Sequence, residues 1–290
     1  MTHPKLLGEL VGWLSEAVSG ELELRRGFTE TGVKVLPLLT GGAVLGTITY
    51  GSDLDFVILL YDLNAESIPK SSHALLKRTL TAIDRELRMT TWGRDLGLRL
   101  CKFALRHAGY RASYVVRKVA RGSFFYLCYH LIALRVPVRL RDPGPPLAGD
   151  RDLFEFKIRI LEEARKRGLR PRLPKGLLST YSPKGLLRVW SYCIPVGHLL
   201  GILEPNRLLE PLSMVEALIE LLSVKEEDAR RAVKALVRLK GMCRRYQIRC
   251  RLAGLLRAGL IGLGELRAIA RVHEAVMRFL DSWRASAPAR

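Results

Sequence analysis

Hydrophobic positions in the first 145 residues form helix-like repeats interrupted by short apolar runs. The first repeat predicts an amphipathic helix over residues 5–26, marked by Leu6, Leu7, Leu10, Val11, Leu14 and Val18. The apolar runs 33–39 and 53–61 are typical of buried strands. Further helices are predicted over about 70–88, 95–108 and 124–134, and further strands over 111–119 and 136–140. Strands with intervening helices indicate an α/β or α+β core over roughly residues 1–145.

The pattern changes after a segment rich in proline and glycine at 142–149. No convincing strand follows this segment. A charged helix is predicted over 151–168, a basic loop over 169–185, and a buried helical hairpin over 185–203. We therefore expect two domains, residues 1–145 and 146–290, of which the second is all-helical.

Two capping boxes indicate where helices of the second half begin. Ser213 is followed three residues later by Glu216, and Ser223 by Glu226, and an apolar-periodic run follows each pair. In the run after the second box, Arg231, Lys234 and Arg238 share one helix face. The apolar residues Val233, Leu236 and Val237 lie on the opposite face.

Charge is strongly positive and unevenly placed. The chain has 48 Lys and Arg against 28 Asp and Glu, a net charge of +20, yet residues 1–60 carry 4 basic and 7 acidic groups. Such a basic remainder favours a polyanionic partner, although cations can also simply solvate helix faces. We expect nucleic acid to contact Arg231, Lys234, Arg238 and Arg245. Aromatic residues among the cations could stack on bases, namely Tyr181, Trp190, Tyr192 and Tyr246.

The cysteines and the hydropathy of the chain indicate in which cellular compartment the protein is expected. The five cysteines are odd in number and form no C-x-x-C pair, which argues against disulfides and zinc and favours a reducing, cytoplasmic setting. The most apolar stretch, Gly185–Leu203, is interrupted by Arg188, Pro195 and His198, so no membrane association is expected. One Gln and two Asn in 290 residues suggest a heat-adapted source.

Residues 40–60 carry the chemistry. Thr40-Gly41-Gly42 precedes Ser52-Asp53-Leu54-Asp55, which continues into the second apolar strand. Two carboxylates two positions apart on a strand share one face, where they can hold a divalent metal. Backbone N–H groups of a nearby glycine turn can hold a phosphate. Together these groups are the minimum needed to transfer a nucleotide.

This combination, over residues 33–141, resembles the DNA polymerase beta-like nucleotidyltransferase superfamily, which includes CCA-adding enzymes, poly(A) polymerases and antibiotic nucleotidyltransferases. The resemblance implies a mixed sheet with flanking helices, here followed by an all-helical domain. It implies that Gly41 and Gly42 hold the triphosphate at the start of a helix, with Ser52 in support. Asp53 and Asp55 would bind Mg²⁺, or Mn²⁺ in its place.

One feature departs from the family. Relatives carry a third carboxylate on the strand that we assign to 111–119, and this chain has no acid there. Either another carboxylate reaches the site, the nearest in sequence being Asp142, Asp150 and Asp152, or the third ligand is missing and catalysis is slow or lost.

The sequence thus predicts a Mg²⁺-dependent nucleotidyltransferase. It would move a nucleoside monophosphate from an NTP, with ATP as the first candidate, to nucleic acid, with RNA as the expected acceptor. One alternative keeps the chemistry and changes the acceptor to a protein or small-molecule hydroxyl. The other is a catalytically inactive nucleic-acid-binding member of the fold.

Overall fold

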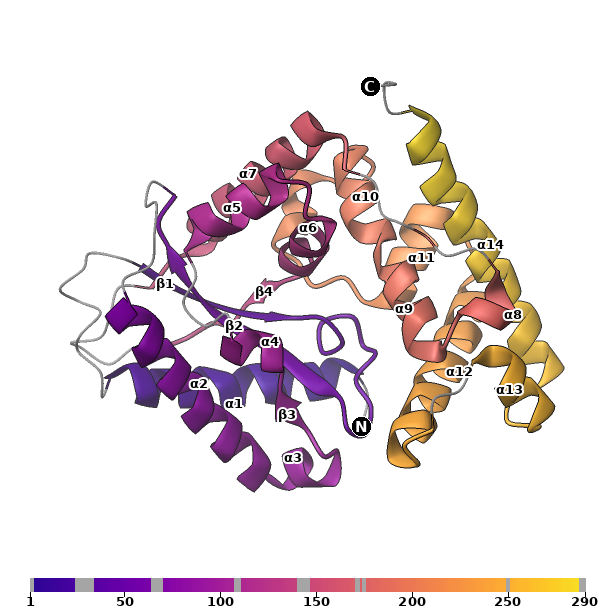
Figure 1. Cartoon of the computed structure of the whole chain (residues 1–290), viewed down its shortest axis with the longest axis horizontal. Coiled ribbons are helices and arrows are strands. Elements are labelled where there is room, and N and C mark those ends of the chain that lie inside the picture. The colour runs from indigo at the N-terminus through magenta and orange to yellow at the C-terminus, as the bar shows by residue number, and fades with distance from the viewer. Residues whose placement is uncertain are drawn as a thin grey trace.

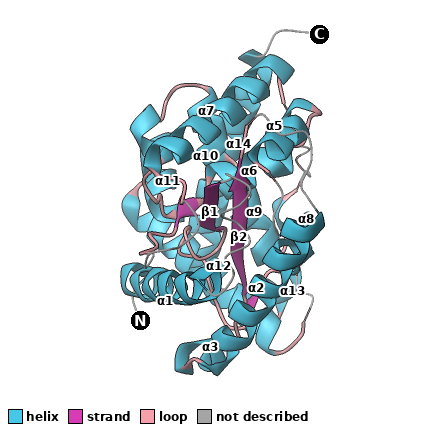
Figure 2. Ribbon diagram, turned by 90° about the vertical axis from the view of Figure 1, so that its left-hand side faces the viewer, coloured by secondary structure: helices cyan, strands magenta, loops and turns pink. Residues whose placement is uncertain are grey.

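A small mixed sheet lies among many helices (Figure 2). The structure is a computed structural model, and the ranges that it describes are 3–23, 34–63, 70–106, 111–139, 147–169, 173, 176–248 and 251–286. Over these ranges the sheet has four strands in the order β3-β2-β1-β4. None of the described helices is long and apolar enough to cross a membrane.

The central pair of strands sets the geometry of the sheet. β1 (Lys34–Thr40) and β2 (Asp53–Tyr61) are antiparallel, and their register brings Thr40 opposite Asp55. β3 (Arg99–Leu100) runs parallel to β2 at one edge, and β4 (Leu134–Arg135) is antiparallel to β1 at the other. The end of β1 therefore lies beside the start of β2.

Helices cover both faces of the sheet because alternate side chains of β1 point to opposite sides. Val35 and Leu39 join a core with α1 (His3–Glu23) and α2 (Lys70–Met89). Leu36 and Leu38 join a second core with α5 (Ala112–Ala120), α6 (Phe124–Leu131) and α7 (Asp150–Arg167). These helices lie on opposite sides of the sheet in Figure 1, and α3 (Thr91–Asp95) and α4 (Lys102–Arg106) flank β3.

The remaining helices form a third core on the right of Figure 1. They are α8 (Leu177–Thr180), α9 (Pro183–Ser191), α10 (Cys193–Leu199), the 3₁₀ helix η2 (Pro205–Leu208), α11 (Met214–Leu222), α12 (Glu226–Arg245), α13 (Leu252–Arg257) and α14 (Leu263–Ser286). Leu45, from the loop between β1 and β2, is buried in this core.

The loop between β1 and β2 is tied to the helical part at three points. The Leu45 carbonyl accepts a hydrogen bond from the Met214 N–H at 2.9 Å. The Thr47 carbonyl accepts one from Lys240 Nζ at 2.6 Å, and the Gly51 carbonyl accepts one from Arg244. Helices α11 and α12 therefore hold the segment that separates the two halves of the motif.

Several predicted elements are confirmed. β2 spans the predicted 53–61, and α1, α2 and α7 match the predicted helices, with 24–26 outside the described residues. Ser213 and Glu216 form the expected capping box. In place of the predicted hairpin, α9 and α10 follow one another with only Tyr192 between them, in a right-handed helical conformation that does not reverse the chain. Within the described residues no strand follows β4 apart from a single bridge at Leu147. The mixed sheet with flanking helices is therefore as expected, whereas the division into two domains stays a prediction.

The predicted strand over 111–119 is wrong. This segment is helix α5, in which Ala112, Val115 and Val119 are buried with the α7 core. Their spacing fits the helical period, so the β-branched composition was misleading.

Four other predicted features differ from the structure. The predicted helix over 95–108 is broken at Gly97 (φ 58°) and contains strand β3, because the Leu100 N–H is held by Asp84 Oδ1 at 2.7 Å. The strand predicted over 136–140 lies earlier, as β4, and Leu140 is outside the described residues. Ser223 ends α11 in a left-handed conformation instead of capping α12. The predicted loop 169–185 contains α8 and the start of α9.

Candidate active site

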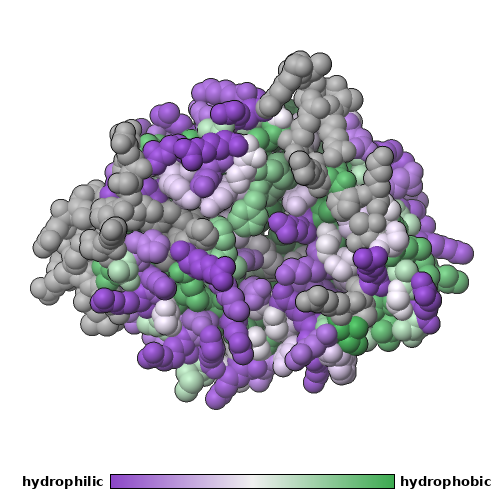
Figure 3. Space-filling model, in the orientation of Figure 1, coloured by the Kyte–Doolittle hydropathy of each residue, from purple (hydrophilic) through white to green (hydrophobic). Residues whose placement is uncertain are grey.

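A pocket of about 350 Å³ opens where β1 ends and β2 begins. Its volume lies in the range of small-molecule sites. It contains every residue that the motif predicts, namely Gly41, Gly42, Ser52, Asp53 and Asp55. Helices α9 and α12 supply the opposite wall. Figure 3 shows that this face of the molecule is hollowed near its centre.

The two aspartates occupy different environments. Asp53 has a half-exposed side chain, with Oδ2 3.7 Å from the Arg244 guanidinium. Asp55 lies deeper, and desolvation raises its pKa to about 6, with a further contribution from the charge of Asp53. A hydrogen bond from the Cys101 thiol and the charges of two lysines act in the opposite direction. A desolvated carboxylate beside a second acid gains free energy when a cation binds.

The glycine turn packs directly on this carboxylate. Gly41 has φ +66°, and a β-carbon there would overlap Asp55 Oδ2. The Leu45 N–H donates to the Gly41 carbonyl at 3.0 Å, and the Thr47 N–H donates to the Gly42 carbonyl at 2.8 Å. Residues 41–46 are therefore a hydrogen-bonded turn, where the resemblance implied the start of a helix. The chain leaves this turn because Leu45 is buried among the C-terminal helices.

Ser52 stabilises the loop in front of β2. Its buried Oγ accepts the Thr49 N–H at 2.9 Å, while the Ser52 N–H donates to the Thr49 carbonyl at 2.9 Å. Ser52 thus holds the turn that delivers Asp53 to the pocket.

Four cations line the opposite wall of the pocket. Lys184 and Arg188 lie one helical turn apart on α9, and Lys240 and Arg244 do so on α12. We call these four residues the cationic wall. Burial, together with the charges of Arg244 and Lys184, lowers the pKa of Lys240 to about 8, against the opposing charges of Asp55 and Asp53. Lys240 is buried and Arg244 is half-buried, whereas Lys184 and Arg188 are exposed. Such a concentration of positive charge is suited to a polyanion.

Sequence reasoning did not single out the cationic wall as part of the site. The available signal was the i, i+4 spacing of each pair beside strongly apolar positions, such as Leu187 on α9 and Leu239 on α12. That signal places the cations near a core, but it does not show that both pairs face the aspartates.

The position beside Asp55 on the neighbouring strand holds Cys101. Its N–H donates to the Leu54 carbonyl at 2.8 Å, which continues the β2–β3 pairing. Desolvation and the charge of Asp55 raise the pKa of the Cys101 thiol to about 11, so it is neutral at pH 7. A neutral thiol therefore stands where a third carboxylate could have joined the two aspartates.

The acids considered as substitutes are engaged elsewhere. Asp152 pairs with Lys34 at 2.9 Å, at the far end of β1, roughly 20 Å from Thr40 at the usual rise of a strand. Asp150 pairs with Arg135 at 2.9 Å and does not line the pocket. Asp142 lies outside the described residues. Within the described ranges, no cluster of three or more His, Cys, Asp or Glu side chains could hold a metal.

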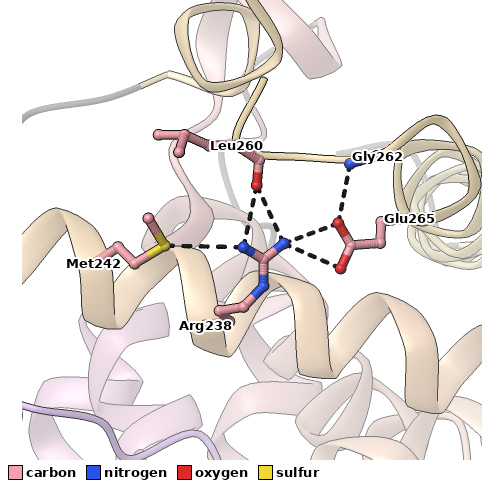
Figure 4. Close-up of polar contacts among 5 residues, drawn as sticks. All are labelled: Arg238, Met242, Leu260, Gly262 and Glu265. Atoms are coloured by element: carbon pink, nitrogen blue, oxygen red, sulfur yellow. Dashed lines mark hydrogen bonds and ion pairs between the residues drawn. The ribbon is translucent and has the colours of Figure 1, made fainter. Parts of the chain in front are cut away.

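The predicted nucleic-acid residues of α12 differ in their surroundings. Arg231 pairs with Glu227 at 2.5 Å. Arg238 donates to the Leu260 carbonyl and to both oxygens of Glu265, as Figure 4 shows. Lys234 is exposed, and the Arg245 guanidinium lies 5.7 Å from the centroid of the Tyr50 ring. The charges of Arg231 and Arg238 are thus offset within the protein.

The four aromatic residues predicted to stack on bases also differ in their accessibility. Tyr181 and Trp190 are buried in the helical core and cannot meet a base from solvent. Tyr192 lines the pocket, and Tyr246 is 64% exposed at the end of α12.

No protein family model matches the chain, and no curated protein shows significant similarity to it.

Proposed function

We propose that this protein is a divalent-metal-dependent nucleotidyltransferase of the polymerase beta-like kind. It would transfer a nucleoside monophosphate from an NTP to nucleic acid, with RNA as the acceptor and ATP as the first donor to test. The observation that carries the proposal is the pocket itself, which joins an acid pair, a glycine turn and the cationic wall.

The residues present suit a divalent cation. Asp53 and Asp55 share one face of β2, and the raised pKa of Asp55 indicates that its surroundings compensate the desolvation of its carboxylate only in part. Two carboxylates can hold Mg²⁺ or Mn²⁺ when substrate phosphates and water supply the other ligands. When bound, the ion would neutralise charge on the phosphoryl oxygens during the reaction.

The protein's own groups suit a triphosphate. Lys184, Arg188 and Lys240 can neutralise phosphate charges from the helical side. Backbone N–H groups of the turn at Gly41 and Gly42 lie on the strand side. With the donor so placed, the acceptor hydroxyl would attack the α-phosphorus, the bond to the leaving pyrophosphate would break, and the hydroxyl proton would pass to solvent.

The alternative from another class is a nucleic-acid-binding protein without catalysis. The neutral thiol of Cys101 beside Asp55 favours it, because among the described residues no third acid joins Asp53 and Asp55 to complete the metal site or to serve as a base. Transfer to a protein or small-molecule hydroxyl is the second alternative, and no feature of the pocket favours it over nucleic acid.

A labelling experiment tests the proposal. The protein is incubated with each α-labelled NTP, Mg²⁺ or Mn²⁺, and a mixed RNA pool, beside Asp53→Asn, Asp55→Asn and the control Asp95→Asn. Asp95 is exposed on α3 and does not line the pocket. We expect label in RNA, a loss of more than about a hundredfold in the two pocket variants, and full activity in the control, since even outer-shell partners of a metal contribute about 10- to 100-fold.

Other results of this experiment would support one of the two alternative functions. Label on protein or on a small molecule would move the acceptor away from nucleic acid. RNA binding without label under any metal would support the inactive binder and overturn the proposed transfer.

A further inference from the structure

An exposed aromatic ring lies in the loop that leads into β2. Tyr50 lies three residues before Asp53 and is 44% exposed. The Arg245 guanidinium lies over its ring, and a β-carbon at Gly97 would be 3.5 Å from the ring edge. Tyr50 therefore stands between the loop before β3 and the end of α12, just outside the pocket.

Two arginines of the described residues lie near Tyr50 or Asp53 without an acidic partner: Arg245 over the Tyr50 ring and Arg99 opposite Asp53. Arg99 lies opposite Asp53 in the parallel pairing of β2 and β3, so both side chains share one face of the sheet, and Arg99 is exposed. Neither Arg99 nor Arg245 forms an ion pair with a carboxylate of the described residues. Their positive charge is therefore available to a partner, in contrast to the charges of Arg231 and Arg238.

The same region exposes a second ring. Tyr246 follows Arg245 directly and is 64% exposed. Exposed aromatic rings next to uncompensated cations are the elements that bind single-stranded nucleic acid, because bases stack on the rings while phosphates meet the cations.

We propose that Tyr50, Arg99, Arg245 and Tyr246 form an acceptor surface that binds single-stranded nucleic acid and leads its 3′ end to the pocket beside Asp53. This inference rests on the proposed function, because it assigns the path of the acceptor. It also moves the nucleic-acid interface from the middle of α12, where Arg231 and Arg238 are paired, to the end of that helix. A single strand is favoured over a duplex because stacking on isolated rings requires unstacked bases.

Binding of a fluorescent 12-nucleotide single-stranded RNA to the full chain, without NTP and with EDTA, tests the surface. The double variant Arg99→Ala/Arg245→Ala removes two uncompensated charges. Its matched control, Arg231→Ala/Arg278→Ala, removes two exposed arginines that pair with Glu227 and Glu274. We expect the first variant to weaken binding at least about tenfold and to reduce the salt slope by about 1.4, at roughly 0.7 per phosphate contact, while the control changes affinity less than about twofold.

Tyr50→Leu separates stacking from charge. It should weaken binding about five- to tenfold with no change in the salt slope. The three substituted residues of the surface, Tyr50, Arg99 and Arg245, are exposed, and thermal unfolding checks that each variant is folded. An equal loss in the control pair, an unchanged salt slope in Arg99→Ala/Arg245→Ala, or a duplex bound as tightly as the single strand would overturn the proposal.

The binding assay and the labelling assay can each refute one proposal without refuting the other. If surface variants lose RNA affinity but no NMP is ever transferred, the binding surface stands and the proposed transfer does not. If NMP is transferred to RNA while the surface variants bind and react like the parent protein, the acceptor follows another path and the acceptor surface is wrong.

Discussion

The carboxylate of Asp55 lies against the α-carbon of Gly41, in the space that a side chain at position 41 would need. The contact follows from the strand register, because Thr40 pairs with Asp55 and the next residue begins the turn. Gly41 also has a positive φ that other residues adopt at a cost. The glycine turn and the acid pair are therefore one structural unit, although fourteen positions separate these two residues in the chain.

Gly41→Ala should damage the site by overlap as well as by backbone strain. The positive φ alone costs about 1–2 kcal/mol, and overpacking against Asp55 adds about 1–3 kcal/mol. The matched control is Gly201→Ala, at φ +71° with open space around the position. Urea unfolding should show the larger loss for Gly41→Ala, and only this variant should lose affinity for Mn²⁺. Equal losses in both variants would mean that the contact with Asp55 is unimportant.

Cys101→Asp should strengthen cation binding. The substitution puts a carboxylate beside Asp55, at the position where the neighbouring strand now offers a neutral thiol. We expect Mn²⁺ affinity, measured by calorimetry, to rise about tenfold or more, and the metal-free protein to lose stability through repulsion between the acids. Cys101→Asn has a similar shape without the charge and should show neither effect. Unchanged Mn²⁺ affinity in Cys101→Asp would place the cation away from Asp55.

Lys240→Met should loosen the loop that precedes Asp53. Lys240 is 8% exposed, and its Nζ donates to the Thr47 carbonyl at 2.6 Å. Losing a hydrogen bond from a charged donor costs about 1.5–3 kcal/mol. Lys234→Met, on an exposed position of the same helix, should change the free energy of unfolding by less than about 0.5 kcal/mol. Chemical denaturation of both variants measures the difference, and similar values for the two would refute the role of Lys240.

Acid should destabilise the protein through His130. Burial, together with the charge of Lys157, lowers the pKa of His130 to about 3 in the folded state. Between pH 6.5 and 3 the unfolded chain therefore takes up a proton that the folded protein does not. The free energy of unfolding contributed by this residue should fall as pH decreases through that range, by up to roughly 1.4 kcal/mol per pH unit.

His130→Phe tests the acid effect by removing the titrating group. Its pH profile should be flatter on the acid side than that of the parent protein. Some acid dependence will remain, because burial also lowers the pKa of His198, to about 4. A profile for His130→Phe that parallels the parent protein would rule out His130 as the cause.

The local pattern of apolar residues was sufficient to predict those helices and strands in which only one period, helical or strand-like, fits the sequence. Residues 53–61 read as a strand and 151–168 as a helix, and both are close to their observed bounds. The segment 111–119 was misassigned because its Val-rich composition and its helical spacing pointed in different directions, and packing against α7 decided for the helix. Similarly, β3 is a strand because Leu54 and Asp84 supply partners that lie far from it in the chain.

The sequence by itself determined the acid pair, the glycine turn and their interval, because strand periodicity alone puts Asp53 and Asp55 on one face. Only the tertiary structure decided what faces them. Lys240 and Arg244 reach the loop between β1 and β2 across 193 residues of chain, and Cys101 reaches Asp55 through a parallel strand pairing. Such contacts depend on how helices and strands pack. The local pattern of residues does not show which distant residues will lie against them.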